Sequence, residues 1–479
     1  MGSVGLNFGS ATSGQGFDVT STVNQIVSNL QNVETPWKTQ LTALQSKDTA
    51  LSSLGTQIST LSTDLQNLTD FSGTMAYKTG SSSDTNVLTL SSASAQAVAG
   101  THTIVVQNLA QTSSAASDSV GAADALTGGI TFKIGTGTWQ TVNVGDGSTA
   151  ATLSGLSAAI NNAGLGVTAN VLTNADGTQR LSLVSQTNGA AGQITIADST
   201  SNPTSPTNLA DSTTTDKNAG LGLAKIQDGI DATINVDGVT LTSASNTVTN
   251  AIPGVTFQLL STGTGSSSAP ESIQVIIAND TTSIETAINT FVNDYNTTMK
   301  AINAQEGKDS SGNPEPLYGT SVLAQLQQGL LSAISSSFGA NTVNSLISLG
   351  ITANASADGT ISLDADKLSN ALNSNFAQVV SLFQDTGSFG SNFTSTLDGL
   401  GNNSASGGAI SLTLGENNSQ ETTLNDNISK QEALIATQKT HLTTELNSAN
   451  QILQAIPTMI EQVNEMYSAI TGYNRNQNG

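Results

Sequence analysis

The chain has 479 residues, which is enough for about three domains with sizeable hydrophobic cores. Acidic side chains outnumber basic ones by 35 to 13, and the formal charge of −22 argues against nucleic acid or an anionic membrane surface as a partner. Cysteine is absent, which excludes disulfides, thiolate zinc sites and cysteine nucleophiles.

Apolar residues near the N-terminus recur every seven positions from Val23 onward, which is the spacing of a coiled-coil seam. Residues 1–16 are rich in Gly and Ser and are predicted to be disordered before assembly. A first helix is predicted to start at the N-cap Asp18, and a second to run from Pro36 to about Phe71. Pro36 separates them because proline lacks a backbone N–H and kinks or breaks a helix.

Strand-like alternation begins at Tyr77, where the apolar residues change from a helical period to a period of two. Two groups of predicted strands, in residues 76–110 and 228–280, are assigned to one discontinuous β-rich head domain. The second group contains Asp237 and Gly238, a pair that strongly indicates a tight hairpin.

The block between these groups, residues 111–227, is predicted to be a separate α+β head domain inserted into the first. Stretches rich in Ser, Thr, Asn and Asp bound it, as linkers or long surface loops would. The apolar spacing of residues 153–160 predicts a short helix that ends near Gly164, and alternating segments around it predict strands.

Helical periodicity returns after the head domains and predicts a helical-bundle leg domain from residues 37–75 and 281–411. Its later helices are predicted to begin at Thr282 and to cover residues 323–334 and 368–383, with a short hairpin at Asp358 and Gly359. The Gly- and Asn-rich residues 384–408 are expected to separate this bundle from the last helix.

A second heptad stripe ends the chain, from Ile428 to Ile470, and Pro457 is predicted to kink or break it. A helix with one apolar stripe gains little stability alone, so the simplest closure pairs the two ends of the chain with each other. Residues 1–36 and 412–479 are therefore predicted to form a terminal coiled-coil domain that is disordered before assembly. The alternative is an ordinary globular helix at each end.

Together these elements predict an α+β multidomain fold: terminal coiled-coil helices, a helical-bundle leg domain and two nested β-rich head domains in a hairpin-like, discontinuous arrangement. Only 10% of residues are charged, a dilution typical of extracellular bacterial surface and appendage proteins. The N-terminus has no signal-peptide pattern, and no segment reaches the roughly 18 apolar residues of a membrane helix. An external protein of this kind would need another export route.

Signals for catalytic or cofactor sites are weak. The two histidines, His102 and His441, cannot form a His-rich metal site with helical spacing. The polar loop 309–313 has the wrong spacing of oxygen ligands for calcium, and the carboxylates Asp364 and Asp366 lie at a helix start, where capping is their expected role. We therefore predict no catalytic, cofactor-binding or metal-binding residues, and no enzyme.

Five stretches, taken in chain order, are similar to one known family: residues 16–21, 100–110, 231–238 with 246–248 and 252–256, 291–296, and 350–351 with 358–364. They resemble the bacterial flagellar filament cap proteins, also called the second hook-associated proteins or FliD family, from the N-terminal signature through the head strands to the leg domain. Residues 153–161 also resemble the Ile-Asn motif that cap proteins share with flagellins. These matches span nearly the whole chain.

The resemblance implies an extracellular cap at the distal end of the flagellum that promotes folding and insertion of exported flagellin, without a cofactor. Its implied partners are further copies of the chain in a ring of roughly four to six, flagellin, the hook–filament junction protein, and a cytoplasmic export chaperone at the C-terminal helix. Nucleic acid and membrane insertion are not expected. Export is expected to proceed without a cleaved signal peptide, by the flagellar type III system.

The two heptad stripes are predicted to contact neighbouring subunits through exposed seams. The residues predicted to do so are Phe17, Val23, Ile26, Leu30, Trp37, Leu442, Leu446, Leu453, Ile456, Ile460 and Tyr467. Hinges of the legs are expected at Pro36 and in residues 399–408. Two other functions stay open at this point: a filament subunit or junction protein of the same appendage, and a surface adhesin that binds through residues 111–227.

Overall fold

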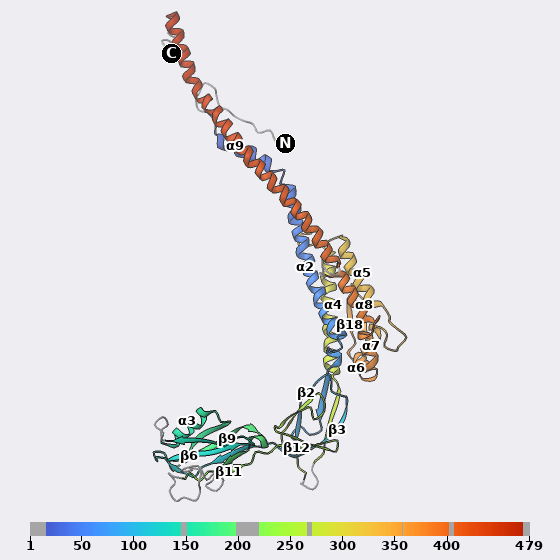
Figure 1. The fold of residues 1–479 in the computed structure, drawn as a ribbon. Coiled ribbons are helices and arrows are strands. Elements are labelled where there is room, and N and C mark those ends of the chain that lie inside the picture. The colour runs from blue at the N-terminus through green and yellow to red at the C-terminus, as the bar shows by residue number, and fades with distance from the viewer. Residues whose placement is uncertain are drawn as a thin grey trace. The chain divides into compact units, whose positions relative to one another are not determined.

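The computed structural model describes residues 16–144, 151–197, 220–265, 271–356, 358–401 and 407–472. The chain divides into two compact units, residues 1–70 with 285–479 and residues 71–284. The first unit contains the long helices and the second contains the main β-sheets (Figure 1). The finer borders between the two head domains, and between leg and terminal coiled coil, stay predictions.

Three helices of the first unit carry the heptad stripes: α1 Val19–Gln31, α2 Thr35–Thr69 and α9 Ala409–Thr471. The Asp18 carboxylate caps α1 by accepting a hydrogen bond from the Ser21 N–H at 3.0 Å. Pro36 lies in the first turn of α2, where its missing N–H leaves no intrahelical bond unmade. The predicted break of the stripe at Pro36 is therefore confirmed.

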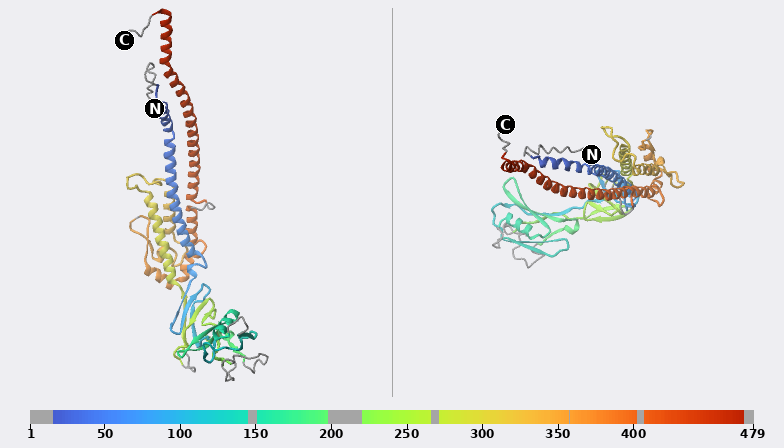
Figure 2. Two further views of the ribbon diagram at one scale, coloured as in Figure 1. Left: turned by 90° about the vertical axis from the view of Figure 1, so that its left-hand side faces the viewer. Right: turned by 90° about the horizontal axis from the view of Figure 1, so that it is seen from above.

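Pro457 lies inside α9 and does not break it. This helix runs for 63 residues through the proline, and Figure 2 shows it curving without an interruption. Proline removes one backbone hydrogen bond, while the turns on both sides of it remain hydrogen-bonded and continue the helix. Of the two predicted outcomes at this residue, a kink or a break, the break is wrong.

A bundle of shorter helices buries the second half of α2 in the first unit. They are α5 Ser321–Ser335, α6 Ala365–Ser374, α7 Phe376–Gln384 and α8 Phe389–Leu400, together with the part of α4 Thr281–Gln305 that follows residue 284. The α2 side chains that are no more than 2% exposed are Leu51, Leu54, Ile58, Leu61, Leu65 and Leu68. A short antiparallel hairpin, β17 Ile351–Ala353 with β18 Ile361–Leu363, completes this part of the unit.

Two predictions for the leg domain are wrong in detail. The helix predicted over residues 368–383 is split into α6 and α7 at Asn375, whose backbone is not helical (φ −133°, ψ 33°). The expected separator, residues 384–408, contains helix α8, while residues 402–406 of the expected hinge lie outside the described part of the chain. Phe389 and Phe393 carry α8 into the core, and both are fully buried.

The β-rich domain of the second unit has a five-stranded antiparallel sheet and a three-stranded one around a shared core. The five strands are, in spatial order, β1 Lys78–Ser82, β16 Ile273–Asn279, β3 Gly100–Asn108, β12 Ala232–Val236 and β13 Val239–Ser243; the three are β14 Thr247–Thr249, β15 Val255–Leu259 and β2 Leu88–Ala93. The β12–β13 turn has positive φ at Asp237 (51°) and Gly238 (90°), as a type I′ turn requires. The predicted hairpin is confirmed.

The block inserted between β3 and β12 has its own core. Its larger sheet has the order β11-β4-β9-β5, with β8 also paired to β9, and the smaller has the order β10-β6-β7. Their bounds are β4 Thr112–Ala116, β5 Val120–Gly121, β6 Gly128–Ile134, β7 Gln140–Val144, β8 Val167–Thr173, β9 Thr178–Asn188, β10 Ile194–Ile196 and β11 Ala224–Gln227. The predicted short helix is α3 Leu153–Ala163, which ends at the left-handed Gly164.

Three asparagines in the family-like stretches each hold another backbone segment by both ends of the side-chain amide. Each accepts a hydrogen bond from a backbone N–H and donates one to the carbonyl of the same residue, as a strand neighbour would. The pairs are Asn161 with Ala169, Asn246 with Ala110 and Asn296 with Ile361, at 2.7–3.0 Å. These residues therefore have a structural role that explains their place in the motifs.

Candidate functional site: the terminal helices

The first and last helices pack against each other through their heptad residues. Val19, Val23 and Val27 of α1 form a small core with Ile435 of α9. The partly buried side chains around it are Phe17, Leu30, Leu442 and Leu446. Since the Phe17 N–H donates to Asn450 Oδ1 at 2.9 Å while Lys38 reaches Glu432, the two helices run antiparallel. The predicted pairing of the two ends is present within one chain.

The predicted contact residues fall into three groups by packing and exposure. Five of them pack in the α1–α9 core of their own chain, where Val23 is buried and the other four are half-buried: Phe17, Val23, Leu30, Leu442 and Leu446. Four are half-buried, namely Ile26, Trp37, Leu453 and Ile456. Ile460 and Tyr467 are exposed by 43% and 59%. A role in binding neighbouring subunits stays a prediction for all of them.

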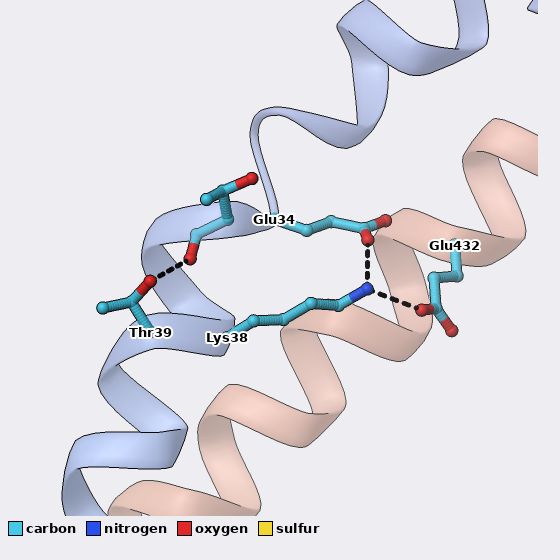
Figure 3. Close-up of polar contacts among 5 residues, drawn as sticks. Glu34, Lys38, Thr39 and Glu432 are labelled. Carbon is cyan, nitrogen blue, oxygen red and sulfur yellow. Dashed lines mark hydrogen bonds and ion pairs between the residues drawn. The ribbon is translucent and has the colours of Figure 1, made fainter.

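An ionic cluster fixes the corner between α1 and α2 (Figure 3). Glu34, the last residue of the corner, has a side chain that is only 2% exposed, and its Oε2 accepts a hydrogen bond from Lys38 Nζ at 2.8 Å. Lys38 Nζ also reaches Glu432 Oε1 of α9 at 3.2 Å. These two hydrogen bonds raise the pKa of the Lys38 ammonium above its ordinary value. The corner is thereby tied to α9 by a lysine that neutralises a buried carboxylate.

The end of α9 shows an apolar surface that the predicted residue set covers only in part. Besides Ile460 and Tyr467, the large apolar side chains exposed there by 47–82% are Ile452, Met459, Val463, Met466 and Ile470. Val463 and Ile470 belong to the predicted heptad stripe. The other three form a second row beside it, which a scan for every seventh residue along one line does not reveal.

The described part of the chain contains no group of three or more His, Cys, Asp or Glu side chains placed to hold a metal ion. The Asp309 carboxylate accepts N–H bonds from Ser311 and Asn313 at 2.9 and 2.8 Å, so it shapes its own loop, and these bonds lower the pKa of Asp309. None of the described helices has the length and apolarity needed to cross a membrane.

Two carboxyl groups face each other inside the leg, Asp64 on α2 and Asp294 on α4. Burial, together with the hydrogen bond and charge of Asp294, raises the pKa of Asp64 from 3.8 to about 6. A raised carboxyl pKa means that the folded state binds the proton more tightly than the unfolded state does. The stabilisation from this group is therefore complete below pH 3.8 and is lost as the pH rises through about 6.

We expect Asp64→Asn to flatten this part of the pH profile. At pH 7.5 the variant should be more stable than the parent by about 1 kcal/mol, a figure reduced for solvent screening, and the gain should vanish near pH 4. Asp294→Asn should act in the same direction because it removes the opposing charge. Urea unfolding at several pH values, followed by circular dichroism at 222 nm, measures the difference; parallel profiles for parent and variant would contradict the raised pKa of Asp64.

Family comparison decides which class of protein carries these helices. The sequence model described as "Flagellar hook-associated protein 2 C-terminus" matches residues 229–469, and that described as "Flagellar hook-associated protein 2 N-terminus" matches residues 15–113. The chain belongs to the flagellar hook-associated protein 2 family. Neither match covers residues 114–228, most of the inserted block. The matched regions include both terminal helices, the leg and most of the β-rich domain.

Relatives within the hook-associated protein 2 family agree with this assignment. The B-type flagellar hook-associated protein 2 of Pseudomonas aeruginosa PAO1 is 32% identical over 65% of this chain and 67% of its own length. The Escherichia coli O157:H7 flagellar hook-associated protein 2 is 28% identical over 74% of this chain and 78% of its own. The crystal structure of the D1-D2-D3 domains of the E. coli flagellar cap protein FliD has the same fold, with a TM-score of 0.55 at 24% identity, covering 76% of this chain and 98% of that one.

Hook-associated protein 2 proteins are structural filament caps of the bacterial flagellum and are not a family of enzymes. This chain accordingly has the function of a filament cap, as the resemblance of its motifs implied. As a member of the family it belongs to an oligomeric cap associated with the filament at the flagellum tip.

Proposed function

We propose that the cap formed by this chain promotes folding and insertion of exported flagellin, and that its terminal helices are the parts that contact neighbouring subunits. The observation that carries the proposal is the apolar end of α9, where side chains from Ile452 to Ile470 lie open to solvent. An exposed apolar surface of this length is characteristic of a protein-binding site. In a cap the proteins within reach are other cap subunits, flagellin and, at the base of a new filament, the junction protein.

The head domains would form the plate of the cap. A ring of roughly four to six copies arises when one patch of the head contacts a different patch of the next copy and the rotation closes. The legs would connect this plate to the filament end, and their hinge is proposed at Pro36, where α1 and α2 are separate helices. Small changes at such a hinge would let the plate step as each flagellin subunit enters.

The same apolar helix end requires protection before the chain leaves the cell. A cytoplasmic chaperone that covers the C-terminal helix would prevent aggregation through residues such as Met459 and Tyr467. We further propose that the chain leaves through the flagellar type III system, without cleavage of a signal peptide. The exposed residues of α9 support the chaperone proposal, and the export route is what the resemblance to the family implies.

Immunogold electron microscopy of intact cells tests the proposal. Antibody raised against residues 111–227 should place gold at filament tips in the parent, and a deletion strain should lack the gold and lose flagellin to the medium. Complementation with the full chain is the control. Gold along the filament or over the cell body, with flagellin retained, would instead favour a filament subunit or an adhesin.

A further inference from the structure

The apolar rows of α9 increase from two to three near the level at which α1 begins. Asn450 marks this level, because its side chain accepts a hydrogen bond from the Phe17 N–H. Before this level one heptad row of α9 is polar, with Gln438 and Glu445. Beyond it the same row continues as Ile452, Met459 and Met466, which are 47–61% exposed.

This added row lies beside two rows that continue from the paired part of the helix. One consists of Ile456, Val463 and Ile470, and the other of Leu453, Ile460 and Tyr467. Two adjacent rows form a seam for one partner helix, and α1 is that partner in the part of α9 from Ile435 to Leu446. Three rows form a wider face that packs against two partner helices at once.

Charge on this segment favours partners of identical sequence. Between residues 451 and 471 the only charged side chains are Glu461 and Glu465, and both lie on the opposite side from the apolar face. The row next to Ile452, Met459 and Met466, at the edge of the face, consists of Ala455, Gln462 and Ala469. Identical helices therefore meet without burying a charge or placing like charges together, and no flanking charge selects a different partner.

We propose that residues 452–470 of α9 pack in parallel against the same segment of two neighbouring copies, so that the cap holds its C-terminal helices in a closed bundle. The inference rests on the proposed function in that several copies assemble around one axis, which makes their helices parallel. The three-row face gives each helix one neighbour on either side. The pairing with α1 stays intact because it uses the part of α9 before residue 452.

Single cysteines test the bundle in the full chain, which contains none of its own. Met459→Cys places a thiol in the added row, and Glu461→Cys places one two residues away on the outer side. A disulfide needs Cα atoms closer than about 7 Å, so mild oxidation of the assembled protein should join copies through residue 459 at least about tenfold faster than through residue 461. Met466→Cys and Ser468→Cys form a second matched pair.

Sedimentation of the same preparations separates the two levels of the proposal. A protein that sediments as an oligomer but forms disulfides equally fast, or not at all, at residues 459 and 461 would overturn the bundle and leave the cap ring standing. A protein that sediments as a monomer at micromolar concentration would contradict the ring and the bundle together. Met459→Glu with Met466→Glu should weaken self-association about tenfold or more, whereas Gln454→Glu with Ser468→Glu should not.

Discussion

Replacing Phe389 by alanine is expected to destabilise the leg by about 3–5 kcal/mol, the largest effect of any single truncation we expect in the helical unit. Phe389 is fully buried and stacks on Phe393 at 5.3 Å between ring centroids. It also makes edge contacts with Phe383 at 5.7 Å and Phe291 at 6.2 Å. These rings come from α4, α7 and α8, so one truncation opens a cavity between three helices.

Circular dichroism at 222 nm during urea unfolding measures this loss, because among the described residues the second unit contributes little helix beyond α3. The matched control is Tyr318→Ala, an aromatic side chain of the same unit that is 55% exposed. We expect the control to stay within about 0.5 kcal/mol of the parent. Equal stabilities of Phe389→Ala and Tyr318→Ala would show that the aromatic cluster is not the core of the leg.

The regular elements of this fold were predictable because one local pattern dominated each of them. The heptad stripe around Leu61 has the 3-4 spacing of a helix buried along one side, and the structure buries it fully. Asp237 and Gly238 adopt the two positive φ angles that their residue types favour, and Gly164 ends α3 in the same way. In each case the local preference agrees with the tertiary environment.

Other features depended on contacts that the sequence does not reveal. Helix α8 is rich in Gly, Ser and Asn, which predicts a loop, but the burial of Phe389 and Phe393 outweighs those weak preferences. Pro457 is tolerated inside α9 although proline usually ends a helix. The heptad pattern predicted that the two ends of the chain pair, but it did not give the register that places Leu442 and Leu446 beside α1.

For the candidate site, the sequence indicated the two terminal helices but only part of the apolar surface that is exposed on α9. Its heptads led to Ile460 and Tyr467, which lie open on α9. Met459 and Met466 were not predicted as contact residues because they lie one row to the side of that stripe. Glu34 and Lys38 were also not predicted, since a charged pair one turn apart normally lies on the helix surface and contributes little to stability. The Glu34–Lys38 pair matters here because the Glu34 side chain is buried, which the sequence does not show.

Lys38→Met is therefore expected to loosen the α1–α2 corner far more than an ordinary surface substitution would. The change leaves the Glu34 carboxylate with 2% exposure and without its lysine partner. Its other oxygen, Oε1, has no hydrogen-bond partner in the structure. An unpaired buried charge is strongly unfavourable, so Glu34 must take up a proton or move into water, and either change disturbs the packing of α1 on α9.

Amide hydrogen exchange of residues 19–31 measures the effect, and we expect it to become at least about tenfold faster in Lys38→Met. Glu432→Gln is the matched control, because it removes only the ion pair between Lys38 and the Glu432 carboxylate, which is 57% exposed. Glu34→Gln added to Lys38→Met should restore much of the protection, since the double variant no longer buries a charge. If the double variant exchanged as fast as Lys38→Met alone, the lysine would act by covering apolar surface, and the neutralisation of Glu34 would not be what holds the corner.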